Sequence, residues 1–135
     1  MKILIDTNVL FATVLYPDGV SMKAYTKAVI SPNSAAVCDY SVDELRRVFN
    51  RKFPHKMDVL DAFFSHMIHS VEIISTPVME VDDEMLIRDI KDRPILRAAI
   101  KFGADLLLSG DKDFLESGIK KPRMISPAGF LTFKK

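Results

Sequence analysis

The sequence predicts a parallel α/β sandwich. Short apolar runs that are typical of buried strands alternate along the chain with longer segments whose apolar residues recur at helical spacing. The chain has 135 residues, the length of one domain, and a hydrophobic fraction of 48%, which is ample for a core. We therefore expect one domain over residues 1–135.

The first half of the chain alternates strands and helices at short intervals. The run K-I-L-I-D at residues 2–6 is apolar and β-branched, which predicts a buried strand, and Pro17-Asp18-Gly19 has the composition of a turn. The later segments of this half carry apolar residues on one helical face. The expected elements are strands at 2–6 and 35–38 and helices at 7–14, 21–30, 41–52 and 58–69.

The second half continues this alternation with shorter elements. Gly103 is expected to end a helix, because glycine adopts the left-handed conformation of a helix C-terminus without strain. The apolar run D-L-L-L-S at residues 105–109 precedes a turn that begins at Gly110. The expected elements are strands at 71–74, 105–109 and 123–126 and helices at 82–90, 93–102 and 110–115.

Composition excludes several classes of protein. The 19 lysines and arginines nearly balance 18 aspartates and glutamates, so a net charge of +1 supplies no global attraction to nucleic acid or anionic membranes. The single cysteine, Cys38, excludes an intrachain disulfide and a zinc site built on several cysteines, and we expect it to be a small buried residue. No apolar run approaches the ~18 residues of a membrane helix. Asp6 and Asn8 interrupt the one segment that resembles a signal peptide, so we expect a cytoplasmic protein.

Acidic side chains lie at the ends of the predicted strands or just after them. Asp6 ends the first strand, Glu44 lies in the first turn of the helix after the second, and Asp111 follows the fourth. Asp92 opens a helix. In parallel sheets the ligand crevice lies beyond the carboxyl ends of the strands, so all four carboxylates are expected to face one crevice.

Carboxylates crowded into one crevice need either a cation or protonation of some of them. Two of them repel each other by about 4 kcal/mol at ~4 Å in a partly shielded site. A divalent metal with oxygen ligands, Mg²⁺ or Mn²⁺, removes this repulsion. Such a metal lowers the pKa of a bound water and offsets charge on phosphoryl oxygens, which suits hydrolysis of a phosphate ester.

The same acidic residues have structural explanations. Ser41-x-x-Glu44 matches a capping box, and Asp92 precedes Arg-Pro as a helix N-cap would. The segment G-D-K-D at residues 110–113 has ordinary turn chemistry. Asp6 is the hardest to explain in this way, because it would be a largely buried carboxylate without a partner.

Four segments, in order, resemble the PIN domain family, metal-dependent nucleases that include many toxins of toxin–antitoxin systems. The resemblance covers nearly the whole chain, and the last segment is similar to the ending of a bacterial and archaeal subgroup of toxin components. It implies a three-layer α/β/α sandwich on a central, mainly parallel sheet. The segments are I-L-I-D-T-N-V-L (3–10), D-E-L-R-R-V-F (43–49), K-D-R-P-I-L-R-A-A-I-K-F-G-A-D-L-L-L-S-G-D-K-D-F-L (91–115) and M-I-S-P-A-G-F-L (124–131).

The resemblance also implies an endoribonuclease that leaves 3′-hydroxyl and 5′-phosphate ends, with Mg²⁺ or Mn²⁺ as cofactor. A small antitoxin protein and a homodimer are the partners that it implies. Asp89 lies near Asp92, and the alignment of Ile95 and Ala99 favours Asp92 as the third acid. The implied catalytic residues are Asp6, Glu44, Asp92 and Asp111, the implied metal ligands are these four and Asp113, and the supporting polar residues are Asn8 and Ser109.

The basic residues after Glu44 have two explanations. They are either contacts to RNA phosphates beside the acidic site or a solvated helix face. The group consists of Arg46, Arg47, Arg51 and Lys52, with Lys56 nearby. His66 and His69 share a helix face but have no third ligand near them in the sequence, which argues against a metal site there. The apolar group at residues 63–68 is expected to be core, or a surface for a partner or a second copy.

Two other functions remain open. The first is a non-catalytic module that binds RNA or a protein through the same acidic pocket. The second is a phosphatase of the haloacid dehalogenase type, which also begins with an aspartate at a strand end and which Ser109 and the acidic turn fit superficially. That family needs a second aspartate two residues after the first, where this chain has Asn8.

Overall fold

The sheet at the centre of the molecule is entirely parallel. A computed structural model describes residues 1–134, and its strands lie in the order β3-β2-β1-β4-β5. Every neighbouring pair of strands is parallel, so the carboxyl ends of all the strands meet at one edge. The strands are β1 (Lys2–Ile5), β2 (Ser34–Cys38), β3 (Glu72–Ile74), β4 (Leu106–Leu108) and β5 (Arg123–Ile125).

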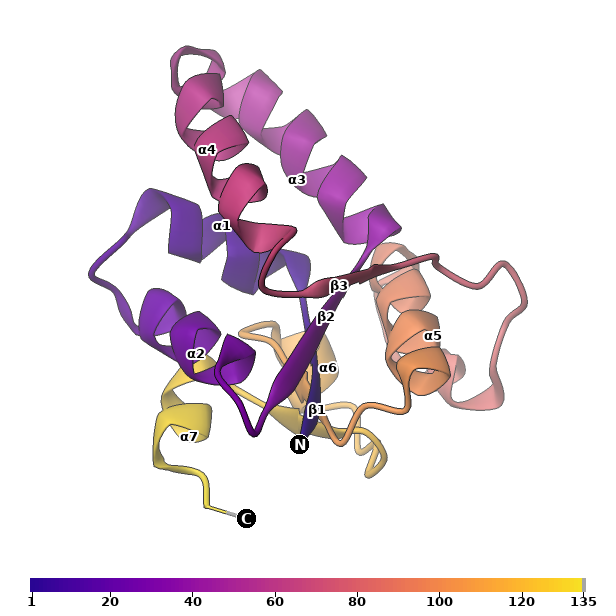
Figure 1. Cartoon of the computed structure of the whole chain (residues 1–135). Helices are drawn as coiled ribbons and strands as arrows, with labels where there is room; N and C mark the ends of the chain where they lie inside the picture. Colours follow the sequence, from indigo (N-terminus) through magenta and orange to yellow (C-terminus); the bar gives the residue numbers. More distant parts are fainter. Residues whose placement is uncertain (135) are drawn as a thin grey trace.

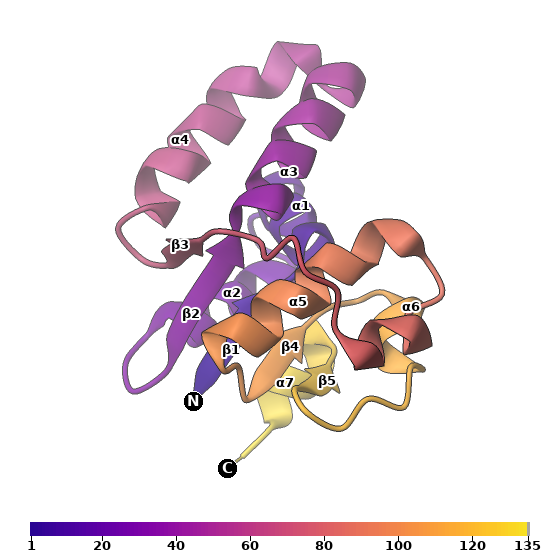
Figure 2. The ribbon, with the colours of Figure 1, turned by 90° about the vertical axis from the view of Figure 1, so that its right-hand side faces the viewer.

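Helices cover both faces of this sheet. They are α1 (Thr7–Leu15), α2 (Val20–Val29), α3 (Asp39–Lys52), α4 (Met57–Met67), α5 (Arg93–Phe102), α6 (Lys112–Leu115) and α7 (Pro127–Thr132), with a short 3₁₀ turn, η1 (Pro54–Lys56), between α3 and α4. Figures 1 and 2 show α1, α2 and α7 on one side of the sheet and α5 on the other, while α3 and α4 extend together beyond the strands. The predicted three-layer α/β/α sandwich is confirmed.

The alternation of side chains along β1 separates two cores. Ile3 and Ile5 are buried with residues of α1, α2, α3, α4 and α7, whereas Leu4 is buried with residues of α5 and α6. All three side chains have no exposed surface, as expected for the central strand of a sheet that is covered on both faces. Cys38 at the end of β2 is also buried, as the sequence predicts.

The segment expected to form one helix over 82–90 is different. It contains two 3₁₀ turns, η2 (Asp82–Leu86) and η3 (Ile90–Asp92), separated by residues 87–89, of which Ile87 is extended. Ile87 is buried in the core, and its carbonyl oxygen accepts a hydrogen bond from Arg93 Nε at 3.0 Å. The Arg93 side chain therefore occupies the Ile87 carbonyl oxygen, which in a continuous helix would accept a backbone hydrogen bond. The chain forms two short turns here, and the second leads directly into α5.

A further helix, α7, is not predicted from the sequence. The last strand ends at Ile125, and Ser126 begins a helix by accepting a hydrogen bond from Gly129 N at its hydroxyl oxygen, at 3.0 Å. Pro127 occupies the first position, where its missing N–H has no cost. The serine and proline pair was the available signal for this helix start.

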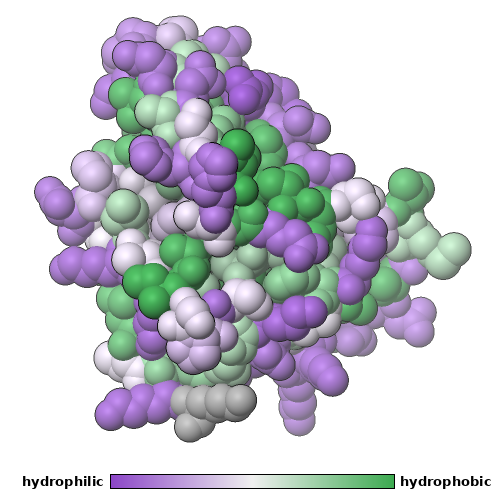
Figure 3. Space-filling model, viewed as in Figure 1, coloured by the Kyte–Doolittle hydropathy of each residue, from purple (hydrophilic) through white to green (hydrophobic). Residues whose placement is uncertain are grey.

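The most exposed apolar side chains lie on the segment between β3 and α5. Val78 and Met79 are 92% and 82% exposed, and Met85 and Ile90 are exposed as well. Figure 3 shows hydrophobic atoms on the segment that projects to the right of the molecule. None of the helices within residues 1–134 has the length and hydrophobicity to cross a bilayer.

The apolar group on α4 belongs mostly to the core. Phe64 and Met67 are buried, and Phe63 is half-buried with its ring centroid 5.5 Å from that of Tyr25. Only Ile68 of this group is largely exposed, at 58%. Most of the group is therefore core, and Ile68 is the side chain of the group with surface available for a contact.

Candidate metal-binding active site

Asp6 lies at the junction of β1 and α1, at the carboxyl edge of the sheet. Its Oδ1 accepts a hydrogen bond from Thr7 N at 2.7 Å, and its Oδ2 accepts one from the Ser109 hydroxyl at 2.7 Å. The side chain is only 2% exposed. Burial raises the pKa of Asp6 to about 7, against the opposing effect of the Ser109 and Thr7 hydrogen bonds. A nearby cation would stabilise the carboxylate form and remove this penalty.

The turn after β4 is connected to Asp6 by hydrogen bonds. The Ser109 hydroxyl oxygen accepts from Asp111 N at 2.9 Å while its hydrogen is donated to Asp6. Asn8 Oδ1 accepts from Gly110 N at 3.3 Å. Ser109 and Asn8, predicted as supporting residues, thus tie the Asp111 backbone to the first helix and fix where the second carboxylate stands.

Glu44 lies one turn into α3 and does not form the capping box that its spacing with Ser41 matches. The helix begins at Asp39, so Ser41 is already inside it, and the Ser41 hydroxyl oxygen accepts from Thr7 Oγ1 at 2.8 Å. Cys38 is the N-cap and makes no side-chain cap hydrogen bond. The structural explanation of Glu44 is therefore wrong, because its carboxylate is not used to cap the helix.

Asp92 precedes α5 and is the least satisfied carboxylate in the site. It makes no capping hydrogen bond, and its buried Oδ2 has no hydrogen-bond partner anywhere within residues 1–134. Burial, together with the neighbouring charges of Asp6 and Asp111, raises the pKa of Asp92 to about 8. A buried carboxylate oxygen without a donor is what a cation-binding site requires in the absence of its ion.

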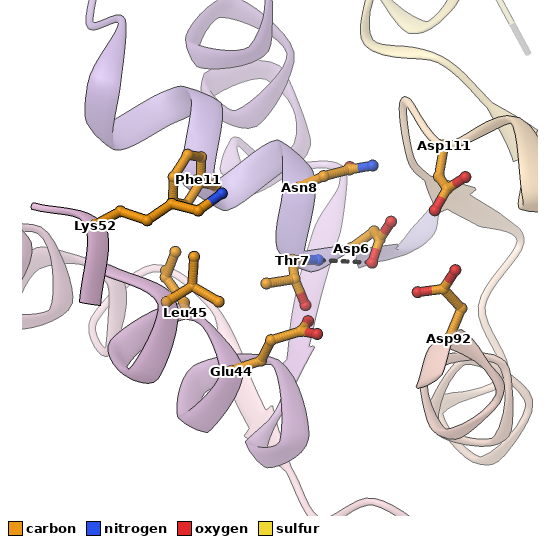
Figure 4. A pocket seen from close by; sticks show the side chains of 10 residues that line it. Asp6, Thr7, Asn8, Phe11, Glu44, Leu45, Lys52, Asp92 and Asp111 are labelled. Carbon is orange, nitrogen blue, oxygen red and sulfur yellow. Dashed lines mark hydrogen bonds between the residues drawn. The ribbon is translucent and has the colours of Figure 1, made fainter. Parts of the chain in front are cut away.

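These side chains face a common cavity of about 270 Å³. Figure 4 shows Asp92 and Asp111 on one side, Glu44 below and Asp6 between them, all directed toward the same space. The ligand atoms on offer are carboxylate oxygens, the donors that Mg²⁺ and Mn²⁺ prefer. The cavity is lined by Asp6, Thr7, Asn8, Phe11, Glu44, Leu45, Val48, Lys52, Asp92 and Asp111.

Asp113 stands outside this cavity lining. Its carboxylate is paired with Arg88 Nε at 2.9 Å, and its backbone N–H donates to Asp111 Oδ1 at 2.9 Å. Asp113 also forms a second acidic group with Asp92 and Asp89, in which one carboxylate oxygen of each lies within 4.8 Å of the others. Asp92 therefore belongs to both groups. Asp89, the alternative to Asp92 as the third acid in the sequence, lies beside it.

The basic residues of α3 do not all face the acidic cavity. Lys52 lines the cavity, whereas Arg46 lies 3.4 Å from Asp61 and over the ring of Phe64 on α4. Arg47 and Arg51 are exposed. Lys52 lies two turns beyond Glu44 on the same face of the helix. The spacing of eight residues between them was the signal in the sequence for this placement.

Two interactions around Asp92 were missed in the sequence. The Tyr40 hydroxyl donates to the Lys91 carbonyl oxygen at 2.7 Å, which attaches the segment before Asp92 to α3. Glu84, 1% exposed, accepts from Arg97 Nε at 2.7 Å and from Arg97 Nη2 at 2.9 Å. This bidentate pair lowers the pKa of Glu84 and attaches η2 to α5. No spacing rule connects these residues, because they meet only through the loop.

Comparisons with known proteins find the same fold in solved structures. A chain in the crystal structure of VapBC2 from Rickettsia felis, bound to a DNA fragment from their promoter, has a TM-score of 0.68 and 15% identity, with 93% of this chain and 98% of that chain covered. Mycobacterium tuberculosis VapC20, described as a Sarcin-Ricin loop cleaving toxin, has a TM-score of 0.63 and 18% identity, with 87% and 95% covered. No curated protein matches the chain in sequence. A model of the PIN domain, however, matches residues 2–113, a stretch that holds β1, β4 and all of the strand-end carboxylates, and the chain therefore belongs to the PIN domain family.

Proposed function

We propose that this protein is a metal-dependent endoribonuclease that hydrolyses RNA phosphodiester bonds. The observation that carries the proposal is the buried, unpartnered Oδ2 of Asp92, which lies in a site shared with Asp6, Glu44 and Asp111. A second carboxylate, Asp6, is almost completely buried. Two carboxylates with raised pKa values beside one cavity are better explained by a cation and chemistry than by fold stability.

Each side chain has a distinct role in this proposal. Asp6, Asp92 and Asp111 would hold Mg²⁺ or Mn²⁺, which supplies an activated water and stabilises charge on the phosphoryl oxygens. Glu44 approaches from the opposite wall, where it orients the attacking water or helps to hold a second ion. Ser109 and Asn8 keep Asp6 and the Asp111 turn in register through the hydrogen bonds described above. Asp113 lies outside the cavity lining and would join the site only after releasing Arg88.

The biological setting that we propose is the toxin half of a toxin–antitoxin pair. Two structurally similar proteins support it, because one belongs to a VapBC complex and the other is a toxin described as cleaving the Sarcin-Ricin loop. The proposed partners are an RNA substrate, a small antitoxin protein and a second copy of the chain. A ribonuclease of this kind would act in the cytoplasm. Family membership removes the haloacid dehalogenase alternative.

The test is cleavage of a mixed RNA by purified protein in Mn²⁺, Mg²⁺ and EDTA. Asp6→Asn is expected to abolish metal-dependent cutting, and the products are expected to carry 3′-hydroxyl and 5′-phosphate ends. Glu44→Gln should lower the rate by at least about 100-fold, since it removes a charge that acts on the reacting water. Its matched control is Asp43→Asn, an exposed acid one residue earlier on α3 that does not line the cavity.

The outcomes separate the remaining functions. Cutting that persists in EDTA or in Asp6→Asn would mean that another nuclease is responsible, and the proposal would fail. RNA binding without cutting under every metal condition would favour the non-catalytic binding module.

A further inference from the structure

The cavity does not end at the carboxylates. It continues along an apolar wall made by Phe11, Leu45 and Val48, and Lys52 lies at its far side. Figure 4 shows the Phe11 ring, Leu45 and the Lys52 amino group gathered on the side away from Asp92 and Asp111. The cavity therefore has an acidic end at the carboxylates and an apolar wall, and Lys52, the lining residue farthest along α3 from Glu44, marks its basic end.

The apolar wall is preorganised. The Phe11 ring packs edge-on against Phe49, with centroids 5.6 Å apart and an interplanar angle of 64°, and it lies 6.0 Å from Phe53. Phe49 is completely buried, while Phe11 keeps part of its surface free in the cavity. The ring is therefore held by the core and presents a fixed aromatic surface at no ordering cost upon binding.

The remaining part of the apolar wall comes from one face of α3. Glu44, Val48 and Lys52 follow one another at intervals of four residues, so they form a row that runs from the acidic end to the basic end. Val48 is half-buried and Lys52 is exposed, so both have surface available to a ligand. The order carboxylate, apolar side chain, ammonium is thus built into a single helix face.

We propose that the Phe11–Val48 wall binds one nucleobase of the substrate strand, while Lys52 pairs with a backbone phosphate beside that base. This inference rests on the proposed nuclease function, because it takes the acidic end as the place of the scissile phosphate. In a single strand, each sugar has a phosphate on either side and carries a base with flat apolar faces. One phosphate at the acidic end, the base on the apolar wall and the other phosphate at Lys52 therefore match the polarity of the lining. Aromatic stacking tolerates every base, so the wall selects an unpaired nucleotide rather than a particular sequence.

The test is equilibrium binding of a 5′-phosphorylated dinucleotide whose first base is the fluorescent 2-aminopurine, so that a phosphate stands on either side of that nucleoside, measured in Ca²⁺ and in EDTA. The protein has no tryptophan, so the fluorescence of the probe can be followed without interference from one. Stacking on Phe11 is expected to quench the probe. A matched abasic dinucleotide, measured by displacement of the probe, is expected to bind about tenfold more weakly in Ca²⁺.

Phe11→Leu should remove most of the difference between the base-bearing and abasic ligands. The control is Phe53→Leu, a half-buried member of the same aromatic cluster that does not line the cavity. Val48→Thr gives a second test that leaves the aromatic cluster intact, so a folding defect in Phe11→Leu does not end the experiment. The inference is overturned if wild-type protein binds the base-bearing and abasic ligands equally well. It is also overturned if Phe53→Leu reduces the difference between them as strongly as Phe11→Leu does. An apolar side chain of a bound protein would then be the better candidate to occupy the wall.

Lys52→Gln tests the basic end separately. Loss of one phosphate contact should lower the slope of log affinity against log salt by about 0.7, whereas Lys120→Gln on an exposed loop should leave it unchanged. An unchanged slope in Lys52→Gln removes the phosphate from the inference. Base-dependent binding by a protein that never cuts RNA would support the wall and reject the nuclease. Cutting with the same KM in wild type and Phe11→Leu would do the reverse.

Discussion

At the scale of single residues, the site is defined by carboxylates whose charged form is destabilised by burial. Asp6 and Asp92 both have pKa values raised chiefly by burial, to about 7 and about 8. Asp6 at least receives two hydrogen bonds, whereas Oδ2 of Asp92 receives none within residues 1–134. An amide or an alanine would be less costly at these positions, which supports the proposal that both carboxylates serve function.

These pKa values predict how stability depends on pH in the absence of metal. The folded protein holds protons on Asp6 and Asp92 more tightly than the unfolded chain, where the ordinary value is 3.8. The free energy of unfolding should therefore decrease as the pH rises from about 4 to about 8 in EDTA, and thermal melts should show a fall of several degrees. Asp6→Asn removes one titrating group, so its melting temperature should depend less on pH across this range. A melting temperature that rises with pH in wild type but not in Asp6→Asn would contradict the assignment.

Tyr40 is predicted to position Asp92. Tyr40→Phe deletes only the hydroxyl that holds the Lys91 carbonyl, so unfolding should change by about 1 kcal/mol or less. Binding of Mn²⁺, measured by calorimetry, should weaken by about tenfold because the supporting partner of a ligand segment is lost. Tyr16→Phe, at a residue that is 65% exposed on the other side of α1, is the matched control. Equal Mn²⁺ affinities in the two variants would assign Tyr40 a purely structural part.

At the scale of elements, the strands and the long helices could be predicted from the sequence, and the segment before α5 could not. Period and capping signals are local, and they were sufficient for β1, for the end of α5 at Gly103 and for the turn after β4. Ile87 is buried and extended because distant side chains hold the chain around it, above all the pair between Glu84 and Arg97. The same limit applies to the site: strand ends predict which acids meet, whereas the Arg88 contact that turns Asp113 outward depends on this loop.

The Glu84–Arg97 pair is expected to be the main support of the loop. Glu84→Gln keeps the shape but leaves the Arg97 charge partly buried without its counter-ion, which should destabilise the protein by about 3 kcal/mol. Hydrogen exchange should accelerate first between residues 78 and 92. Asp82→Asn, at an exposed acid in the same loop, should change neither quantity measurably. Uniform acceleration across the whole sheet would show that the pair stabilises the fold in general and not this loop.

At the scale of the whole molecule, metal binding and folding should be linked. The carboxylates come from the junction of β1 and α1, from α3, from the residue before α5 and from the turn after β4, so the complete set exists only in the folded chain. Mn²⁺ at about 100 times its dissociation constant should stabilise wild type by about 2.7 kcal/mol, seen as a higher melting temperature. Asp6→Asn should show a much smaller shift, and the difference between the two proteins should be greater at pH 8 than at pH 6, since only deprotonated carboxylates bind the ion. Equal shifts in both proteins would place the ion elsewhere.

The strand order has a consequence for the time at which the protein becomes active. β1 is made first, yet its partner on one side is β4, which follows it by about a hundred residues in the chain. Ser109 and Asp111, which complete the surroundings of Asp6, leave the ribosome later still. At the usual pace of synthesis a nascent chain spends several seconds with Asp6 exposed and no site around it. In the proposed nuclease, hydrolysis of RNA therefore has to wait until the turn after β4 has left the ribosome and reached Asp6.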